Sequence, residues 1–123
     1  MKKILIIEDE QALQKTLTSK LESEGYKVFT SLNGIEGLEI AKKEKPTLII
    51  LDLILPKKNG FEVLEGLKID EDTKEIPVIV LTNLENMGDI QKVIDLGATT
   101  YLVKANYELN EILEKIKKIL ETK

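Results

Sequence analysis

Short apolar runs alternate along the chain with longer stretches whose apolar residues recur at helical spacing, and this alternation limits the possible folds most. Three of the five runs consist almost only of Ile, Leu and Val, which is typical of strands buried on both faces of a parallel sheet. The alternation therefore predicts a doubly wound α/β fold. The five predicted strands are Ile4–Ile7, Tyr26–Phe29, Leu48–Leu51, Val78–Leu81 and Tyr101–Val103.

Right-handed crossovers leave few arrangements for five parallel strands that are joined by helices. We expect the strand order 2-1-3-4-5 of a flavodoxin-like, three-layer sandwich, in which the first and third strands are neighbours at the switch point. Residues that follow the strands at their carboxyl ends then share one edge of the sheet.

Polar residues and glycines indicate where the helices begin and end. Asn33 is expected to cap the second helix, and Asn59-Gly60 to begin the third. Gly25 and Gly97 stand where helices should stop. The fifth helix has a strong amphipathic pattern, with apolar residues at Leu109, Ile112, Leu113, Ile116, Ile119 and Leu120.

The composition excludes several classes of function. The sequence contains no cysteine and no histidine, which excludes disulfides, zinc sites and cysteine or histidine nucleophiles. A net charge of −4 argues against nonspecific binding of nucleic acid, which needs a basic face. Because the chain shows neither a signal peptide nor an apolar stretch long enough for a bilayer, we expect a cytoplasmic protein that binds no membrane.

The length of 123 residues fits one domain with one core. We find no linker, low-complexity segment or internal repeat, so we expect a single domain over residues 1–123. Whether this domain stands alone or was cut from a longer regulator is left open.

Carboxylates follow two of the predicted strands. The first strand ends in Glu8-Asp9, and the third is followed by Asp52. Three acids at one edge repel each other unless a cation neutralises them, and oxygen ligands alone suit a hard divalent ion such as Mg²⁺. Taken alone, Glu8-Asp9 is more often a helix cap, but a cap and a metal ligand are compatible roles.

A hydroxyl and an ammonium group follow the last two strands. Thr82 alone reads as a strand former and Lys104 alone as a solvated surface charge. Both lie at the same edge as the three carboxylates, however. There each could bind one oxygen of a phosphoryl group while a metal ion binds another.

Taken together and in order, these segments resemble the receiver domain of bacterial two-component response regulators. The resemblance covers essentially the whole chain and is carried by Ile4–Glu10, Leu51–Pro56 with Gly60, Leu81-Thr82 and Gly97–Lys104. No single motif is decisive, but the complete set at this spacing is highly specific.

The resemblance implies a role for each site residue. Asp52 would accept the phosphoryl group, and Thr82 and Lys104 would bind its oxygens. Tyr101 would be the aromatic residue that turns from an exposed to a buried rotamer when Thr82 moves. Ligands of Mg²⁺ would be Asp9 directly, Glu8 through water, Asp52 and the backbone carbonyl of Ile54.

The resemblance further implies a signalling switch rather than an enzyme. The phosphoryl group would come from a sensor histidine kinase or a phosphotransfer protein. The fourth helix, fifth strand and fifth helix would then bind a downstream protein or, after phosphorylation, a second copy of the chain. This face carries Tyr101 and Asn106-Tyr107, and the fifth helix has more apolar positions than one narrow stripe needs, although all of them could equally pack inward.

The sequence departs from the usual family pattern at two positions. Ala105 replaces the Pro that usually follows the Lys, which leaves the geometry of that loop open because a cis bond before Ala is costly. Asn83 replaces a small residue. The resemblance also implies that Ile54 and Leu84 flank the path of the attacking water. Both are apolar and offer no group that could orient this water, which predicts a long-lived phosphoryl state unless both are merely solvent-excluded packing residues.

Three other functions are compatible with a strand-end Asp or with this fold. A phosphohydrolase of the haloacid dehalogenase type needs a second Asp where Ile54 stands. An FMN carrier of the flavodoxin type needs a phosphate-binding first loop, and Glu8-Asp9-Glu10 would repel that phosphate. A degenerate receiver that only binds proteins remains the alternative, although all the expected site residues are present.

Overall fold

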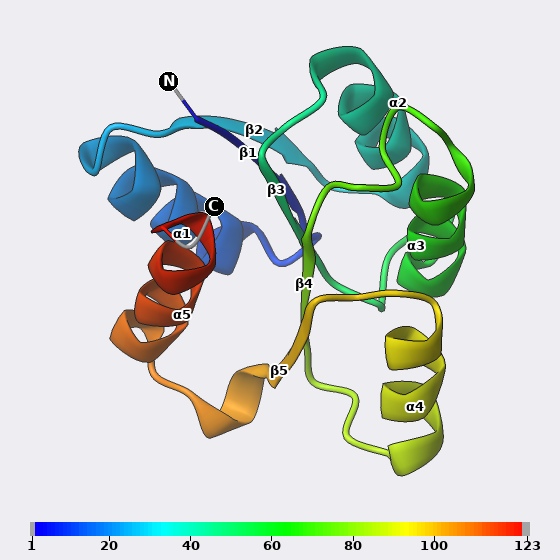
Figure 1. The fold of residues 1–123 in the computed structure, drawn as a ribbon. Helices are drawn as coiled ribbons and strands as arrows, with labels where there is room; N and C mark the ends of the chain where they lie inside the picture. Colours follow the sequence, from blue (N-terminus) through cyan, green and yellow to red (C-terminus); the bar gives the residue numbers. More distant parts are fainter. Residues whose placement is uncertain (1, 122–123) are drawn as a thin grey trace.

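Residues 2–121 form five strands and five α-helices that alternate in sequence (Figure 1). The structure is a computed structural model that describes residues 2–121. In chain order the elements are β1 (Lys3–Ile7), α1 (Gln11–Ser23), β2 (Lys27–Ser31), α2 (Gly34–Glu44), β3 (Leu48–Leu51), α3 (Gly60–Ile69), β4 (Val78–Thr82), α4 (Met87–Asp95), β5 (Thr100–Val103), a short 3-10 helix (Lys104–Asn106) and α5 (Leu109–Glu121).

The strands form one parallel sheet in the order β2-β1-β3-β4-β5, which confirms the predicted topology. Helices α1 and α5 cover one face of the sheet, and α2, α3 and α4 cover the other (Figure 1). Each predicted strand is present within two residues of its expected bounds. The largest difference is at β2, an edge strand that reaches Ser31, beyond its apolar run.

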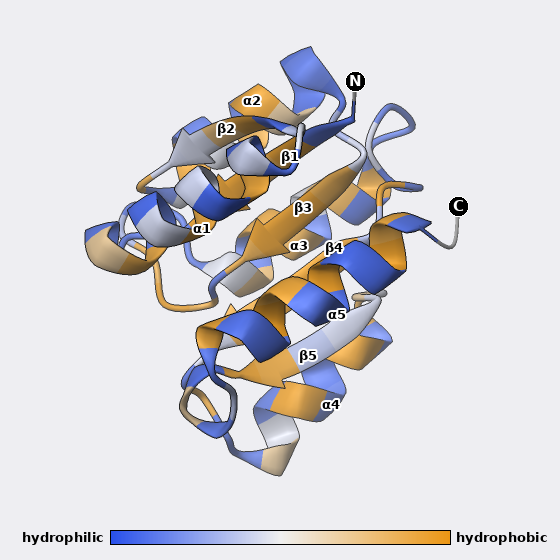
Figure 2. Ribbon diagram, turned by 90° about the vertical axis from the view of Figure 1, so that its left-hand side faces the viewer, coloured by the Kyte–Doolittle hydropathy of each residue, from blue (hydrophilic) through white to orange (hydrophobic). Residues whose placement is uncertain are grey.

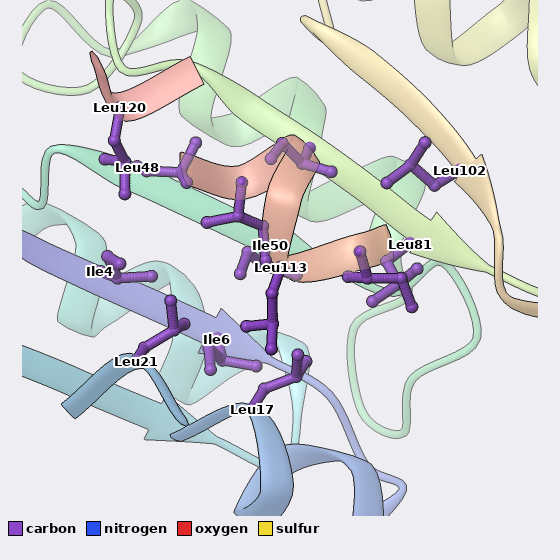
Figure 3. Close-up of a cluster of buried hydrophobic side chains, with 13 residues drawn as sticks. Ile4, Ile6, Leu17, Leu21, Leu48, Ile50, Leu81, Leu102, Leu113 and Leu120 are labelled. Carbon is purple, nitrogen blue, oxygen red and sulfur yellow. The ribbon is translucent and has the colours of Figure 1, made fainter. Parts of the chain in front are cut away.

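One apolar core lies on each side of the sheet, because successive side chains of a strand point to opposite faces. Figure 2 shows apolar strands between helices whose outward faces are polar. In β1, Leu5 and Ile7 pack toward α2, α3 and α4, whereas Ile4 and Ile6 pack toward α1 and α5. On the latter side (Figure 3), the strands contact Leu17 and Leu21 of α1 and Ile112, Leu113, Ile116 and Leu120 of α5.

The predicted helix ends are confirmed at four positions. The side chain of Asn33 accepts a hydrogen bond from the backbone N–H of Glu36, and Asn59 forms a capping box with Glu62 at the start of α3. Gly25 and Gly97 have φ angles of 97° and 102° just beyond α1 and α4, which is the left-handed conformation that glycine adopts most readily.

The predicted cap of the first helix is wrong. The residue that caps α1 is Glu10, and its side chain makes no cap hydrogen bond. Glu8 instead accepts the backbone N–H of Glu10 with Oε2, at 3.0 Å. Carboxylate oxygens of Glu8 and Asp9 lie together with Asp52 at the carboxyl edge of the sheet.

The structure also resolves the open geometry after β5. Residues 2–121 contain no cis peptide bond, and Lys104–Asn106 form a 3-10 helix that leads into α5. None of the helices in the described part of the chain has the length and apolar character needed to cross a bilayer.

Candidate functional site

Functional side chains from four strands meet at the carboxyl edge of the sheet. The backbone N–H of Asp52 donates to the carbonyl of Ile7 at 3.0 Å, and that of Glu8 donates to the carbonyl of Ser31 at 3.0 Å. The parallel ladder thus continues past β1 and β3, and it sets Glu8 and Asp52 side by side. Thr82 ends the next strand, β4.

Three carboxylates form one cluster at this edge. Ligand atoms of Glu8, Asp9 and Asp52 all lie within 4.8 Å of one another. Glu8 and Asp52 are buried, whereas Asp9 is exposed. One carboxylate is therefore open to solvent while two are largely shielded from it, which makes their mutual repulsion stronger than it would be in water.

Lys104 supplies positive charge to this cluster. Its Nζ lies 2.8 Å from Oε1 of Glu8, 3.1 Å from Oδ2 of Asp52 and 3.2 Å from Oε1 of Glu10. The three carboxylates thus already bind one positively charged group, the ammonium of Lys104. The remaining oxygen of Asp52, Oδ1, accepts the backbone N–H of Ile54 at 3.2 Å.

The pKa values of Glu8 and Lys104 are both raised, for different physical reasons. Burial is the main reason why the pKa of Glu8 is raised from 4.5 to about 7. The charge of Asp52 also raises this pKa, whereas hydrogen bonds from Lys104 and from the Glu10 backbone lower it. For Lys104, burial alone would lower the pKa, but the hydrogen bond with Glu8 and the charges of Asp52 and Glu8 outweigh burial and raise it. The ammonium is thus held firmly in its charged form.

The Thr82 hydroxyl is buried and has no partner. The residue is fully shielded from solvent, and its Oγ1 is the one buried side-chain polar atom without a hydrogen bond among residues 2–121. A buried hydroxyl left unpaired costs free energy. This orphaned donor at the same edge as Asp52 and Lys104 therefore indicates a site where a ligand oxygen would be bound.

Tyr101 is half-buried, which differs from the exposed rotamer that we expected. Its hydroxyl donates to the carbonyl of Leu84 at 2.7 Å and so joins β5 to the loop between β4 and α4. Burial raises the pKa of Tyr101, and the charges of Asp89 and Asp52 raise it further. The ring is already partly turned in, and its hydroxyl is tied to the chain two residues after Thr82.

Ile54 and Leu84, the two apolar residues expected beside the acceptor, differ in solvent exposure. Ile54 is 55% exposed, so the interpretation of this side chain as a solvent-excluded packing residue is wrong. Leu84 is half-buried beside the core on the α2, α3 and α4 side. An exposed apolar side chain two residues after Asp52 contributes no group that could polarise a water there.

The loop between β3 and α3 is fixed by close backbone approaches. Gly60 donates its N–H to the carbonyl of Leu53 at 3.0 Å, and a side chain there would overlap the Asp52 carbonyl oxygen. A side chain at Gly34 would likewise overlap the carbonyl of Lys58. These close contacts fix the path of the backbone that follows Asp52.

Two residues of the site were missed by the sequence analysis. Glu10 contacts Lys104, and its position directly after the acid pair is the signal that could have identified it. Gln14 is buried on α1 and donates from Nε2 to the carbonyls of Glu8 at 3.1 Å and Ser31 at 3.0 Å. Nothing in the sequence distinguishes Gln14 from an ordinary polar helix residue.

The residues present fit a hard divalent cation. The cluster offers carboxylate oxygens only, without the nitrogen or sulfur ligands that favour zinc or copper. Lys104 shows that the same oxygens already hold a positive charge. Glu8, Asp9 and Asp52 are thus a chemically suitable ligand set for Mg²⁺.

Comparison with known proteins agrees with this arrangement. The family model described as the response regulator receiver domain matches residues 4–117. The chain is 35% identical to the sporulation initiation phosphotransferase F of Bacillus subtilis (strain 168), over 98% of this chain and 95% of the relative.

A second relative is a longer protein. The chain is 40% identical to the DNA-binding dual master transcriptional regulator RpaA of Synechocystis sp. (strain ATCC 27184 / PCC 6803 / Kazusa) over 98% of its own length, but it spans only 49% of RpaA. The resemblance to RpaA is therefore confined to about half of that protein.

A solved structure with a metal ion has the same fold. The receiver domain of the sensor histidine kinase PA1611 from Pseudomonas aeruginosa PAO1, which has a magnesium ion coordinated in its active-site cleft, is 26% identical with a TM-score of 0.83. The match covers 95% of this chain and 95% of that one.

Proposed function

The chain belongs to the response regulator receiver family, and from this premise we propose that it is a phosphorylation-activated signalling switch whose acceptor is Asp52. The family is a class of signalling switch rather than a class of conventional enzyme. The observation that carries the proposal is the orphaned Thr82 hydroxyl at the edge that also holds Asp52 and Lys104. We further propose that residues 1–123 act as a single domain in the cytoplasm.

In the proposed reaction, a carboxylate oxygen of Asp52 attacks the phosphorus of a phosphohistidine on a sensor histidine kinase or phosphotransfer protein. The P–N bond breaks, and the imidazole leaves with its electron pair. Lys104 and the Thr82 hydroxyl donate hydrogen bonds to phosphoryl oxygens. Mg²⁺, held by Asp9, Asp52, the Ile54 carbonyl and, through water, Glu8, would neutralise charge on the phosphoryl group and the acids.

The proposal is tested by treating the protein with acetyl phosphate and Mg²⁺. Intact-protein mass spectrometry should show one added phosphoryl group that survives acid and is lost in mild base, as expected for an acyl phosphate. Failure of any adduct to form would favour the alternative, a degenerate receiver that binds proteins without phosphorylation.

Mg²⁺ should stabilise the fold, because the ion binds only the folded protein and relieves the repulsion of Glu8, Asp9 and Asp52. Millimolar Mg²⁺ is expected to raise the melting temperature by about 3–5 °C. Asp9→Ala should lose this shift, whereas Glu39→Ala, which removes an exposed acid of α2, should keep it. An equal shift in Asp9→Ala would contradict the metal assignment.

The phosphoryl group on Asp52 should be long-lived, with a half-life well beyond seconds. Neither Ile54 nor Leu84 can orient a water or act as a base. We expect Ile54→Asn and Leu84→Glu to shorten the half-life at least about tenfold, measured by the decay of the mass adduct. Ile69→Asn is the matched control, because Ile69 is also an exposed isoleucine, at the end of α3. Unchanged decay in both site variants would refute the hypothesis.

We expect the output of the switch to travel through Thr82 and Tyr101. A phosphoryl group on Asp52 would draw the Thr82 hydroxyl toward it, and the ring of Tyr101 would then turn further inward. This movement would break or replace the 2.7 Å hydrogen bond from the Tyr101 hydroxyl to the Leu84 carbonyl. NMR with and without beryllofluoride should show the largest shift changes at these three residues. If the shifts around Tyr101 stay unaltered, the switch does not operate through this tyrosine.

The surface that this switch would change comprises α4, β5 and α5. In α5, four of the apolar residues that suggested an outward surface are buried, so they pack inward. On α4, however, Met87 is 76% and Ile94 52% exposed. We therefore place the contact with a downstream protein, or with a second phosphorylated copy, on the α4 side of this face. Sedimentation with beryllofluoride distinguishes these two partners.

A further inference from the structure

Among the described residues, three acids contact Lys104, and Glu10 is the one that is open to solvent. Its side chain is 58% exposed, whereas those of Glu8 and Asp52 are 3% and 6% exposed. All three have an oxygen within 3.2 Å of Nζ of Lys104. Glu10 therefore approaches the ammonium from the solvent side, and the other two approach it from inside the protein.

Glu10 lies at the rim of the site and is joined to Asp52 through Lys104, which contacts both carboxylates. On its other side Glu10 lines a surface groove with Asn83, Lys104 and Ala105 and with apolar residues of α1 and α5. Because its side chain makes no cap bond to α1, its contact with Lys104 is what holds the carboxylate at this position. The rim of the site thus carries a fixed negative charge.

We propose that Glu10 determines which class of phosphoryl donor reacts with Asp52. This inference rests on the proposed function. A negative charge at the rim repels a donor in proportion to the donor's own negative charge. Glu10 therefore disfavours acyl phosphates such as acetyl phosphate, which is a dianion at neutral pH. It disfavours less the N-phosphoryl donors, whose nitrogen carries or shares positive charge.

The two donor reactions differ only in the leaving group. With acetyl phosphate, an Asp52 oxygen bonds to phosphorus, the P–O bond to the acetyl group breaks, and acetate leaves with the electron pair. With phosphoramidate, the P–N bond breaks and the already protonated nitrogen leaves as ammonia. Both reactions give the same acyl phosphate on Asp52, so a difference between them reports on the donor.

The contact with Lys104 allows a second role for Glu10, which is to hold the ammonium in place. That role would change the reactivity of Asp52 itself and would affect both donors alike. Glu10→Gln separates the two roles, because the amide oxygen can still accept a hydrogen bond from Lys104 but the charge is gone. Glu10→Ala removes both the charge and the bond.

The test measures phosphorylation rates with each donor at saturating Mg²⁺ and low ionic strength. Glu10→Gln should react about fivefold faster with acetyl phosphate but only about twofold faster with phosphoramidate. The ratio of the two rates should rise equally in Glu10→Ala, and it should return toward the wild-type ratio in high salt. Glu22→Gln, which removes an exposed charge near the other end of α1, should leave the ratio unchanged.

Each other result has a definite meaning. An unchanged ratio in Glu10→Gln, or a change in Glu10→Ala alone, would overturn the proposed selection by charge while leaving phosphorylation of Asp52 intact. Absence of reaction with either donor in the wild type would overturn the proposed function, and the inference with it.

Discussion

Asp52→Asn is expected to abolish the acyl phosphate altogether. The amide of Asn has the size of the carboxylate but is too weak a nucleophile to attack phosphorus. In the proposed site Asp9 and Glu8 would serve the metal ion, Asp9 directly and Glu8 through water, so neither carboxylate is expected to replace Asp52 as the acceptor. A loss of all detectable adduct is therefore the largest change that any single substitution should cause.

Intact-protein mass spectrometry after treatment with acetyl phosphate measures this loss. Asp95→Asn is a suitable control, since it removes an exposed acid at the end of α4 whose side chain accepts a hydrogen bond from Gln91 of the same helix. The control should be phosphorylated like the wild type. A base-labile adduct that persists in Asp52→Asn would place the acceptor on another residue.

The fold could be predicted from the sequence because its decisive signals are local. Runs such as Leu48–Leu51 are too short for helices and too apolar for loops, and alternation with helical stretches then leaves one common strand order. The bounds of β2 were less accurate, since an edge strand exposes polar residues such as Lys27 and Thr30, and apolar content does not mark its end.

The candidate site could be predicted only in part. The strand order is enough to bring Glu8, Asp9 and Asp52 to one edge, since these residues directly follow neighbouring strands. The reach of Lys104 to Glu10 could not be predicted, because it depends on side-chain conformations and on a helix cap that the sequence suggested wrongly.

The half-buried state of Tyr101 also escaped prediction. Its position depends on the path of the loop after β4, whose Leu84 carbonyl accepts the tyrosine hydroxyl. Sequence periodicity describes which face of an element is apolar, but it does not describe loop paths. Contacts between a strand and a loop therefore need coordinates.

Gly60→Ala is expected to lower the free energy of unfolding by about 3 kcal/mol, and the melting temperature by about 10 °C. The reason is steric. A methyl group at Gly60 would overlap the carbonyl oxygen of Asp52 and the Cα of Leu53, and backbone atoms cannot move aside as the end of a side chain can. The N–H of Gly60 also bonds to the Leu53 carbonyl, so relief by movement of α3 would break that bond.

Gly66→Ala in the same helix is the matched control. Its methyl group would meet only the flexible end of Leu38, at 3.0 Å, and alanine is favoured over glycine inside a helix by about 1 kcal/mol. Thermal unfolding should therefore show a large loss for Gly60→Ala and no loss for Gly66→Ala. Because the overlap falls on Asp52 itself, Gly60→Ala should also be phosphorylated more slowly at temperatures where it is still folded. Equal stability of the two variants would show that the loop after β3 can shift without cost, and that the close approach of Gly60 does not fix the backbone of Asp52.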